Sequence, residues 1–147
     1  MNSPVIRPLA VGDQPEWRRL WSLYLEFYET VVDERVFEAT FERLLSSDER
    51  DFHALVLERD GGLGGLAHYL FHRHCWKIED VCYLQDLYVD RDLRGTGCGR
   101  ALMEAVYAAA DGAGSPSVYW LTQHFNEAGR RLYDRVGTVT PFIRYVR

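Results

Sequence analysis

Three glycines behind an arginine form the segment of this sequence with the clearest chemical meaning. Gly95, Gly97 and Gly99 alternate after Arg94, and apolar residues at helical spacing follow them. Glycine lets the backbone turn tightly, and successive N–H groups in such a turn form a concave site for negatively charged oxygen. The N-terminus of the following helix adds unpaired N–H groups and the positive end of its dipole. The segment therefore predicts a phosphate or pyrophosphate site.

Two common phosphate-binding motifs do not fit this segment. The P-loop needs four residues between its glycines followed by Gly-Lys-Ser/Thr, and the dinucleotide motif needs G-x-G-x-x-G. Here Gly99 comes one residue early for the dinucleotide motif, and Arg100 stands where its third glycine belongs. The spacing instead resembles the coenzyme A pyrophosphate loop of the GNAT superfamily of acyl-CoA N-acyltransferases. The alternative for the segment alone is an ordinary glycine-rich turn.

Short strands and amphipathic helices surround this segment and must position it. Runs of β-branched and aromatic residues predict strands, whereas apolar residues at i, i+3, i+4 and i+7 predict helices. Strands are expected at residues 4–9, 52–59, 63–71, 81–89 and 118–122, helices after Asp13, after Asp33, at 98–110 and at 127–136, and a bent strand or closing hairpin at 138–147. Without a repeat or a low-complexity linker, the chain is predicted to form one mixed α/β domain over residues 1–147.

Polar residues and glycines mark the ends of these elements. Asp13, Asp33 and Asn126 precede apolar periodic runs and are expected to cap three helices. Gly137 is expected to end the last helix as its C-terminal cap. Two adjacent glycines at 64–65 predict a bulge or a loose register near the start of the third strand.

The first predicted helix carries an aromatic stripe at helical spacing, made of Trp17, Leu20, Trp21, Tyr24, Phe27, Tyr28 and Val31. The simpler interpretation is that this stripe is hydrophobic core. The alternative interpretation is that Tyr24 and Tyr28 reach past the core and line a pocket for an amine that accepts the acyl group, because aromatic faces attract cationic amines.

Composition excludes several classes of protein. Of 147 residues, 47% are hydrophobic and 14% aromatic, so a disordered chain is excluded. The net charge of −5 argues against general nucleic-acid binding and mildly favours a cationic acceptor. No apolar run approaches the roughly 20 residues of a membrane span, and no signal-peptide hydrophobic region is present. A cytoplasmic protein that does not enter a membrane is expected.

Cysteines and histidines predict neither a disulfide framework nor a metal site. The three cysteines, Cys75, Cys82 and Cys98, are odd in number and lack zinc spacing. His68, His72 and His74 alternate on a predicted strand, but no fourth ligand is evident nearby. No metal is therefore expected.

The end of the chain strengthens the family resemblance. The run Asn-Glu-Ala-Gly-Arg-Arg-Leu-Tyr-Asp-Arg-Val-Gly at residues 126–137 resembles the second GNAT signature, and the resemblance covers about residues 83–137. It looks closest to the branch of diamine (spermidine/spermine) and histone-type acetyltransferases. It implies the GNAT fold, with one central, mixed, mostly antiparallel sheet flanked by about four helices. It also implies acetyl transfer from acetyl-CoA to a primary amine, and it makes a homodimer plausible, with the aromatic tail at 142–146 exchanged or paired.

The resemblance assigns roles to individual positions. The backbone of Leu87, Tyr88 and Val89 is implied to pair with pantetheine and to hold the thioester carbonyl. The pyrophosphate is implied to bind Arg94, Gly95, Thr96, Gly97, Cys98, Gly99 and Arg100, whereas Asn126 to Gly129 border the pantetheine arm. Tyr133 matches the general acid that protonates the leaving thiolate; the alternative is a tyrosine that only packs on the sheet. Tyr24, Tyr28, Gln85 and Asp86 are expected to contact the acceptor.

Gln85 is the main departure from the polyamine-acetylating relatives, which typically have a Glu there that acts as base through water. A neutral amide cannot take a proton. An alkyl amine with a pKa of about 10.4 must lose a proton before it can react at pH 7, at a cost of roughly 4.6 kcal/mol. Proton transfer from a tyrosine to the leaving thiolate is a smaller task, because their ordinary pKa values differ by only about 2 kcal/mol in free energy. Another group must then serve as base, namely Asp86, Glu79, Asp80, Glu26 or a histidine, unless the acceptor has a lower pKa.

The acceptor and the activity leave alternatives. A small-molecule amine is favoured over a protein lysine or N-terminus. Direct transfer is favoured over a covalent intermediate on Cys98, because the resemblance places that residue against the pyrophosphate. The alternative from a different functional class is a non-catalytic module that binds and senses acyl-CoA. The absence of a carboxylate at Gln85 favours this alternative, whereas the presence of Tyr133 favours the enzyme.

Overall fold

The computed structural model describes residues 4–147 and contains one five-stranded sheet in the order β1-β2-β3-β4-β5. The first three residues of the predicted domain lie outside the described residues. The strands are β1 (Val5–Pro8), β2 (His53–Arg59), β3 (Gly62–His72), β4 (Val81–Val89) and β5 (Val118–Tyr119). Neighbours pair antiparallel except β4 and β5, which pair parallel. The mixed, mostly antiparallel sheet that the sequence predicts is confirmed.

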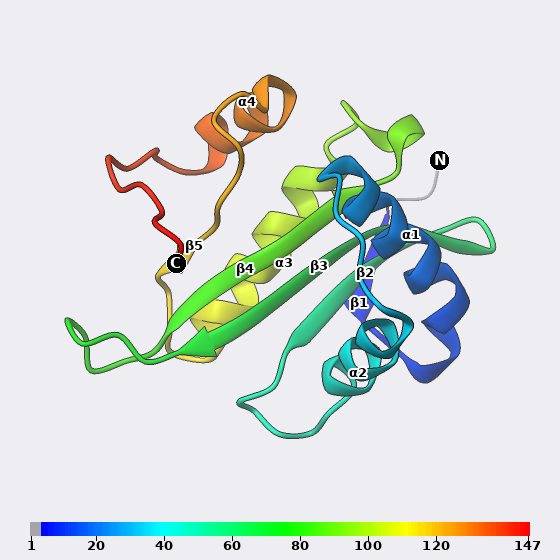
Figure 1. Cartoon of the computed structure of the whole chain (residues 1–147), viewed down its shortest axis with the longest axis horizontal. Coiled ribbons are helices and arrows are strands. Elements are labelled where there is room, and N and C mark those ends of the chain that lie inside the picture. The colour runs from blue at the N-terminus through cyan, green and yellow to red at the C-terminus, as the bar shows by residue number, and fades with distance from the viewer. Residues whose placement is uncertain (1–3) are drawn as a thin grey trace.

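The described residues form the helices α1 (Gln14–Phe27), α2 (Glu34–Leu44), α3 (Cys98–Gly112) and α4 (Glu127–Val136), with 3-10 turns η1 (Val11–Asp13) and η2 (Arg91–Leu93). Figure 1 shows α1 and α2 over one face of the sheet, α3 over the other, and α4 set off to one side near α3. One core lies between the sheet and α1 and α2, and contains the buried Trp17 and Leu20. The other lies under α3 and contains Leu102 and Met103. The first half of the predicted aromatic stripe, Trp17, Leu20 and Trp21, is therefore core, whereas Phe27 and Val31 are exposed and Val31 lies beyond the end of α1.

Two irregularities in the register of β3 shape the sheet. Leu57 pairs with Gly65 and Glu58 with Leu63, so Gly64 is an extra residue, as the two glycines predict. His68 pairs with Asp86 and Tyr69 with Leu84, so Gln85 is the extra residue of a second bulge. A bulge bends its strand and redirects the side chains around it. The second bulge lies in the middle of β4, where the sequence shows no glycine.

Helix ends follow the predicted caps in two of three cases. The Asp33 carboxylate accepts the Arg35 N–H at 2.9 Å, and the Asn126 amide oxygen accepts the Gly129 N–H at 3.2 Å. Asp13 does stand at the N-cap position of α1, but the predicted capping by its side chain is wrong, because its carboxylate binds the Arg7 guanidinium and the Ala10 N–H instead.

The C-terminal predictions need correction too. Gly137 does end α4, but its φ of −152° is extended and not the left-handed conformation of a glycine cap. Strand β5 has only two residues, where residues 118–122 were expected. Residues 138–147 form no strand, and the predicted bent strand or hairpin is wrong for the single chain. A strand at the sheet edge needs a partner for its backbone groups, and this tail has none within the described part of the chain.

Candidate active site

The candidate site begins where β4 and β5 separate. Their parallel pairing is confined to Cys82 with Val118 and Tyr83 with Tyr119. Beyond this point the chain after β5 leaves the sheet toward α4, as Figure 1 shows. The edge of β4 from residue 84 to 89 therefore has no strand partner among residues 4–147. Backbone groups on such an edge are free to bind an extended ligand.

Aromatic and aliphatic side chains from four elements line a crevice at this opening. They are Tyr24 and Tyr28 from α1 and its C-terminal end, Leu84, Gln85 and Leu87 from β4, Trp120 and Leu121 after β5, and Tyr133 from α4. We call this set the β4–β5 crevice. It brings together three of the predicted acceptor contacts, Tyr24, Tyr28 and Gln85, with the predicted acid Tyr133. Leu84, Trp120 and Leu121 were missed, because a strand-period pattern does not show that two parallel strands part.

Tyr133 lies largely buried against Trp120, with the two ring centroids 5.7 Å apart. Burial, with a smaller contribution from Tyr28, raises the pKa of the Tyr133 hydroxyl to about 12. The hydroxyl therefore keeps its proton at neutral pH. Since it also lines the crevice, it is placed to donate a hydrogen bond to a ligand there.

The glycine loop has the conformation that anion binding requires. Gly95 has a φ of +79° and Gly97, the N-cap of α3, a φ of +89°. Both are left-handed conformations that L side chains rarely adopt. Gly99 is needed for a different reason, because a β-carbon there would lie 3.1 Å from Leu132 of α4. The first helical N–H with a partner belongs to Ala101, which donates to the Gly97 carbonyl at 2.9 Å.

The charged and polar side chains of this loop are exposed, but each one binds a neighbouring residue of the chain. Arg94 donates to the Val89 carbonyl at 3.2 Å and covers the Tyr88 ring. Arg100 forms an ion pair with Glu104 at 2.8 Å. The Thr96 hydroxyl donates back to the Leu93 carbonyl. The site that the loop offers is therefore mainly its backbone N–H groups, and the two arginines would need to turn outward to add charge.

The side chain of Cys98 is turned away from the loop surface. The residue is 7% exposed and belongs to the core under α3, and its sulfur lies 3.2 Å from the Thr96 hydroxyl. This burial agrees with the expectation that Cys98 is not a nucleophile, since a reactive thiol needs access to its substrate.

The side chains of the predicted pantetheine strand point in different directions. Leu87 lines the β4–β5 crevice. Val89 packs against the core under α3, whereas Tyr88 packs on the α1 side. Only the backbone of Tyr88 and Val89 is thus available at the open edge.

Asn126 and Gly129 form the N-terminal cap of α4. Besides capping Gly129, the Asn126 amide donates to the Thr122 hydroxyl at 2.9 Å. A β-carbon on Gly129 would lie 2.4 Å from the Asn126 amide nitrogen. The structure gives both residues a role in holding α4 beside the crevice, and their contact with pantetheine stays a prediction.

Asp86 is buried beneath the crevice. Its Oδ2 accepts the Trp21 indole N–H at 3.2 Å and lies 2.8 Å from Nδ1 of His68. Trp17 donates its indole N–H to Nε2 of His68 at 2.9 Å. Asp86 therefore does not line the crevice as predicted, and it reaches it only through a neighbouring side chain. His68, Trp17 and Trp21 are functional neighbours that the sequence did not single out in this role.

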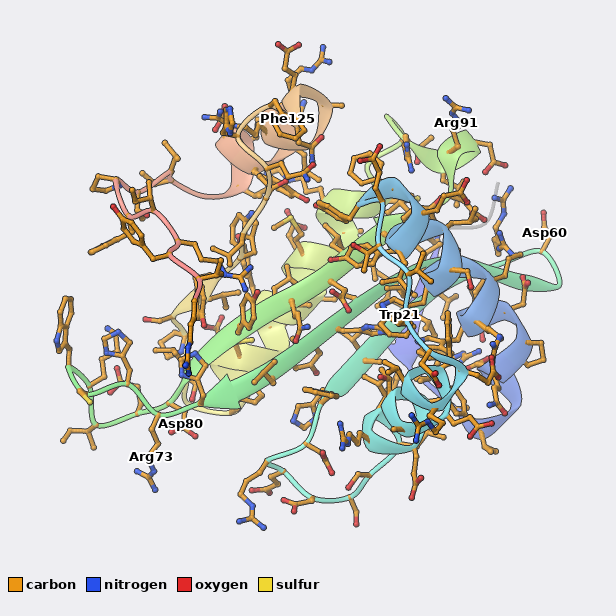
Figure 2. The ribbon with its side chains drawn as sticks, viewed as in Figure 1. Trp21, Asp60, Arg73, Asp80, Arg91 and Phe125 are labelled. Atoms are coloured by element: carbon orange, nitrogen blue, oxygen red, sulfur yellow. The ribbon has the colours of Figure 1, made fainter. Side chains whose placement is uncertain are left out.

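The other candidate bases lie elsewhere. Figure 2 shows Asp80 in the connection between β3 and β4, at the end of the sheet away from α4, and Glu79 precedes it. Glu26 lines a separate open groove between α1 and the β2–β3 turn. His72 is bound to the Tyr119 hydroxyl at 2.7 Å. None of these lines the β4–β5 crevice.

No metal or membrane feature is found in the part of the chain that the structure describes. Residues 4–147 contain no group of three His, Cys, Asp or Glu side chains arranged to hold a metal ion. No helix among them is long and apolar enough to cross a membrane.

The site thus combines an open strand edge with a glycine loop and a helix N-terminus, an arrangement suited to hold an extended ligand that carries phosphate. Residues 17–138 match the model of the Acetyltransferase (GNAT) family, and the chain belongs to that family. It is 38% identical over 144 residues to the D-amino-acid N-acetyltransferase HPA3 of Saccharomyces cerevisiae, covering 97% of this chain and 89% of that protein. The protein is thus an N-acetyltransferase of a family whose members use acetyl-CoA.

Solved structures agree on the fold. The aminoglycoside acetyltransferase AAC(6')-Iy, in complex with a bisubstrate analogue, matches with a TM-score of 0.85 at 17% identity, covering 99% of this chain and 98% of that one. A ribosomal-protein-alanine N-acetyltransferase from Brucella melitensis biovar Abortus 2308 matches with a TM-score of 0.81 at 20% identity, covering 99% of each chain. These likenesses support the fold alone.

Proposed function

We propose that the protein transfers the acetyl group of acetyl-CoA directly to the primary amine of a small molecule, with Tyr133 as the general acid. The observation that carries this proposal is the position of Tyr133. Tyr133 lines the crevice at the unpaired edge of β4 and keeps its hydroxyl proton, in the structure that also presents the glycine loop.

In the proposed reaction, the backbone at the N-terminus of α3 binds the pyrophosphate, and the open edge of β4 binds the pantetheine arm. The amine nitrogen attacks the thioester carbonyl carbon, an N–C bond forms and the C–S bond breaks. Backbone N–H groups of the Val89 segment stabilise the developing negative oxygen. Tyr133 donates its proton to the leaving thiolate.

Burial changes the pKa values of both groups in this proton transfer, the Tyr133 hydroxyl and the coenzyme A thiol. A hydroxyl with a pKa of about 12 faces a thiol whose ordinary pKa is about 8.5, an uphill difference of roughly 4.8 kcal/mol. Removal from bulk water in the crevice also destabilises a thiolate, which raises the thiol pKa and narrows the difference between the two pKa values. Tyr133 is thus suited to hydrogen-bond the sulfur as charge develops and to give up its proton late.

A small amine is the proposed acceptor because the crevice is narrow and its walls include the aromatic rings of Tyr24, Tyr28 and Trp120. Such rings attract ammonium groups. By their names, HPA3 acts on D-amino acids and AAC(6')-Iy on aminoglycosides. We rank amino acids first and aminoglycosides and polyamines next. The diamine and histone-type branch, and a protein acceptor, stay predictions.

The test is release of coenzyme A thiol with D-amino acids, L-amino acids, aminoglycosides, polyamines and a lysine peptide. Turnover with one small-molecule class, lost by about 100-fold in Tyr133→Phe at unchanged acetyl-CoA affinity, is the expected result. Turnover with the lysine peptide alone would contradict a small-molecule acceptor and indicate a protein substrate instead. Binding of acetyl-CoA without turnover on any acceptor would favour the sensing module.

We further propose that two chains associate through the C-terminal tail. Val139, Phe142, Ile143, Tyr145 and Val146 are each more than 70% exposed in the single chain. An apolar surface of this kind is typical of a protein interface. Cytoplasmic location and the absence of nucleic-acid binding also stay predictions.

A further inference from the structure

The bulge in β4 separates the roles of two adjacent residues. Gln85 is the extra residue and lies exposed at the crevice, whereas Asp86 takes the position opposite His68 and is 7% exposed. Strand β4 thus carries the Asp86 carboxylate one residue after the neutral Gln85 amide. The carboxylate faces the α1 side of the sheet, where the Trp21 indole N–H contacts it.

Hydrogen bonds fix the state of His68. The Trp17 indole N–H can only donate, so Nε2 of His68 must accept and carries no proton. The ring proton then resides on Nδ1 and is donated to Asp86. In this arrangement His68 is neutral. Asp86 is therefore a buried carboxylate held by neutral N–H donors, and it forms no ion pair with a lysine or arginine.

The two donors to Asp86 leave one of its carboxylate oxygens unused. Both donors, Trp21 and His68, bind the same oxygen, Oδ2. Neither of them uses Oδ1, which leaves an acceptor position on Asp86 for a proton.

Tyr24 lines the crevice beside the residue that precedes this carboxylate. Its hydroxyl lies 3.5 Å from the Gln85 carbonyl. Burial and the negative charge of Asp86 raise the pKa of the Tyr24 hydroxyl far above its ordinary value. Tyr24 therefore stays protonated at neutral pH, with its hydroxyl at a position one residue along β4 from Asp86.

We propose that the Tyr24 hydroxyl passes the proton of the attacking amine to Asp86. The acceptor ammonium first loses a proton to the Tyr24 oxygen while Tyr24 gives its own proton to Asp86, which frees the lone pair on nitrogen. The amine then attacks the thioester carbon, the electron pair of the C–S bond leaves on sulfur, and the sulfur takes a proton from Tyr133. The second proton of the nitrogen, lost as the amide forms, restores the Tyr133 hydroxyl, and Asp86 releases its proton to solvent through Tyr24 after the products leave. This inference rests on the proposed acetyl transfer and supplies the base that Gln85 cannot.

The surroundings of Asp86 favour this route over others. The groups that face it are Trp21 and Tyr24 from α1, His68 from β3 and Tyr83 on β4. His68 is occupied on both nitrogens, and Trp21 cannot accept a proton. Tyr83 does not line the crevice, although the charge of Asp86 contributes to raising the pKa of its hydroxyl.

The experiment measures kcat/KM for acetyl transfer from pH 6 to pH 10.5 in the full chain, together with acetyl-CoA affinity by calorimetry. It compares the parent with Tyr24→Phe, Asp86→Asn, their double variant and Tyr83→Phe. Asp86→Asn keeps an oxygen for the His68 and Trp21 N–H groups, so the fold is maintained. Tyr83→Phe removes a hydroxyl of the same strand outside the crevice and serves as the matched control.

Tyr24→Phe and Asp86→Asn are expected to lose about 100-fold in kcat/KM at pH 7 with unchanged acetyl-CoA affinity. The loss shrinks toward pH 10.5, because the amine then loses its proton to solvent. The double variant should be no worse than either single variant, since the two residues act as one unit. Tyr83→Phe should retain parent activity.

A loss of less than about 3-fold in Tyr24→Phe at pH 7, or a loss that is equal at every pH, would overturn the relay. Multiplicative losses in the double variant would do the same. In both cases the parent enzyme still turns over, so the proposed function stands. A parent chain that binds acetyl-CoA but acetylates no acceptor would instead overturn the proposed function, and the relay with it.

Discussion

Gly137 lies directly against the indole ring of Trp120, so close that a β-carbon at this position would come within 2.6 Å of the ring. The contact joins the end of α4 to the segment that follows β5. Trp120 in turn lies beside Tyr133, whose carbonyl accepts the Gly137 N–H at 2.8 Å. The position of Tyr133, the proposed acid, therefore depends on the absence of a side chain at Gly137, one helical turn later.

Gly137→Ala should displace α4 from Trp120 and lower both stability and turnover. Overpacking of this kind costs about 1–3 kcal/mol. Calorimetric melting and the thiol-release assay measure the two effects. Gly112→Ala is the matched control, because it places a methyl at the end of α3 with no atom within 4 Å. If Gly137→Ala melts and turns over like the control, the contact with Trp120 does not position Tyr133.

Gly97→Ala should weaken acetyl-CoA binding beyond its effect on stability. An alanine at a φ of +89° is strained by about 1–2 kcal/mol, and relief of the strain would rotate the N–H groups that open α3. We expect roughly a 10-fold rise in Kd by calorimetry, the equivalent of about 1.4 kcal/mol. Gly114→Ala carries the same kind of strain, at a φ of +72° beyond the other end of α3. Equal affinities in the two variants would count against the loop as the pyrophosphate site.

Asn126→Ala should remove the cap of α4 and the link to Thr122. The loss of an N-cap costs about 0.5–2 kcal/mol, and α4 carries Tyr133. Asn126→Asp keeps the oxygen that accepts the Gly129 N–H and loses the donor to Thr122. A melting temperature that falls in Asn126→Ala and recovers in part in Asn126→Asp is expected. Full stability in Asn126→Ala would assign Asn126 to ligand binding alone.

Asp13 should make the fold sensitive to acid. Hydrogen bonds from Arg7 and Ala10 outweigh burial and hold the pKa of the Asp13 carboxyl below its ordinary value. A carboxyl with a lowered folded-state pKa stabilises the fold above its unfolded pKa of about 3.9, and this stability is lost as the pH falls through the lower folded value.

Asp13→Asn should therefore reduce the free energy of unfolding by about 1–3 kcal/mol at pH 7 and much less near pH 2. Urea unfolding at both pH values measures the difference. A variant that is equally destabilised at the two pH values would show that packing, and not the charge of Asp13, supplies the stability. Asp48→Asn is the control, since Asp48 pairs with Arg50 only in an exposed loop.

Phe142→Glu should dissociate the proposed homodimer. Phe142 is 78% exposed in the single chain, so a charge there costs little in the monomer but disrupts an apolar interface. Sedimentation equilibrium of the full chain is expected to give a dimer for the parent and a monomer for the variant. Val11→Glu, at a 77% exposed position on η1, should leave the dimer intact. A monomeric parent would contradict the proposal.

Much of this protein follows from its sequence alone. Left-handed glycines at 95 and 97 and the caps at Asp33 and Asn126 depend on local backbone preferences, which the residue types reveal. The order of strands and helices depends on periodicity, which is equally local. Tyr133 was placed near the acyl group by resemblance, and the structure puts it in the β4–β5 crevice.

The tertiary structure decided the features that depend on distant partners. Asp13 could cap α1, but the Arg7 guanidinium competes for its carboxylate. The tail has the composition of a strand, yet a strand forms only where another chain segment satisfies its backbone groups. The bulge that turns Asp86 toward His68 and Trp21, and the parting of β4 from β5 that opens the crevice, arise from packing between elements far apart in the chain. Sequence periodicity cannot report such packing, because it describes each element without its neighbours.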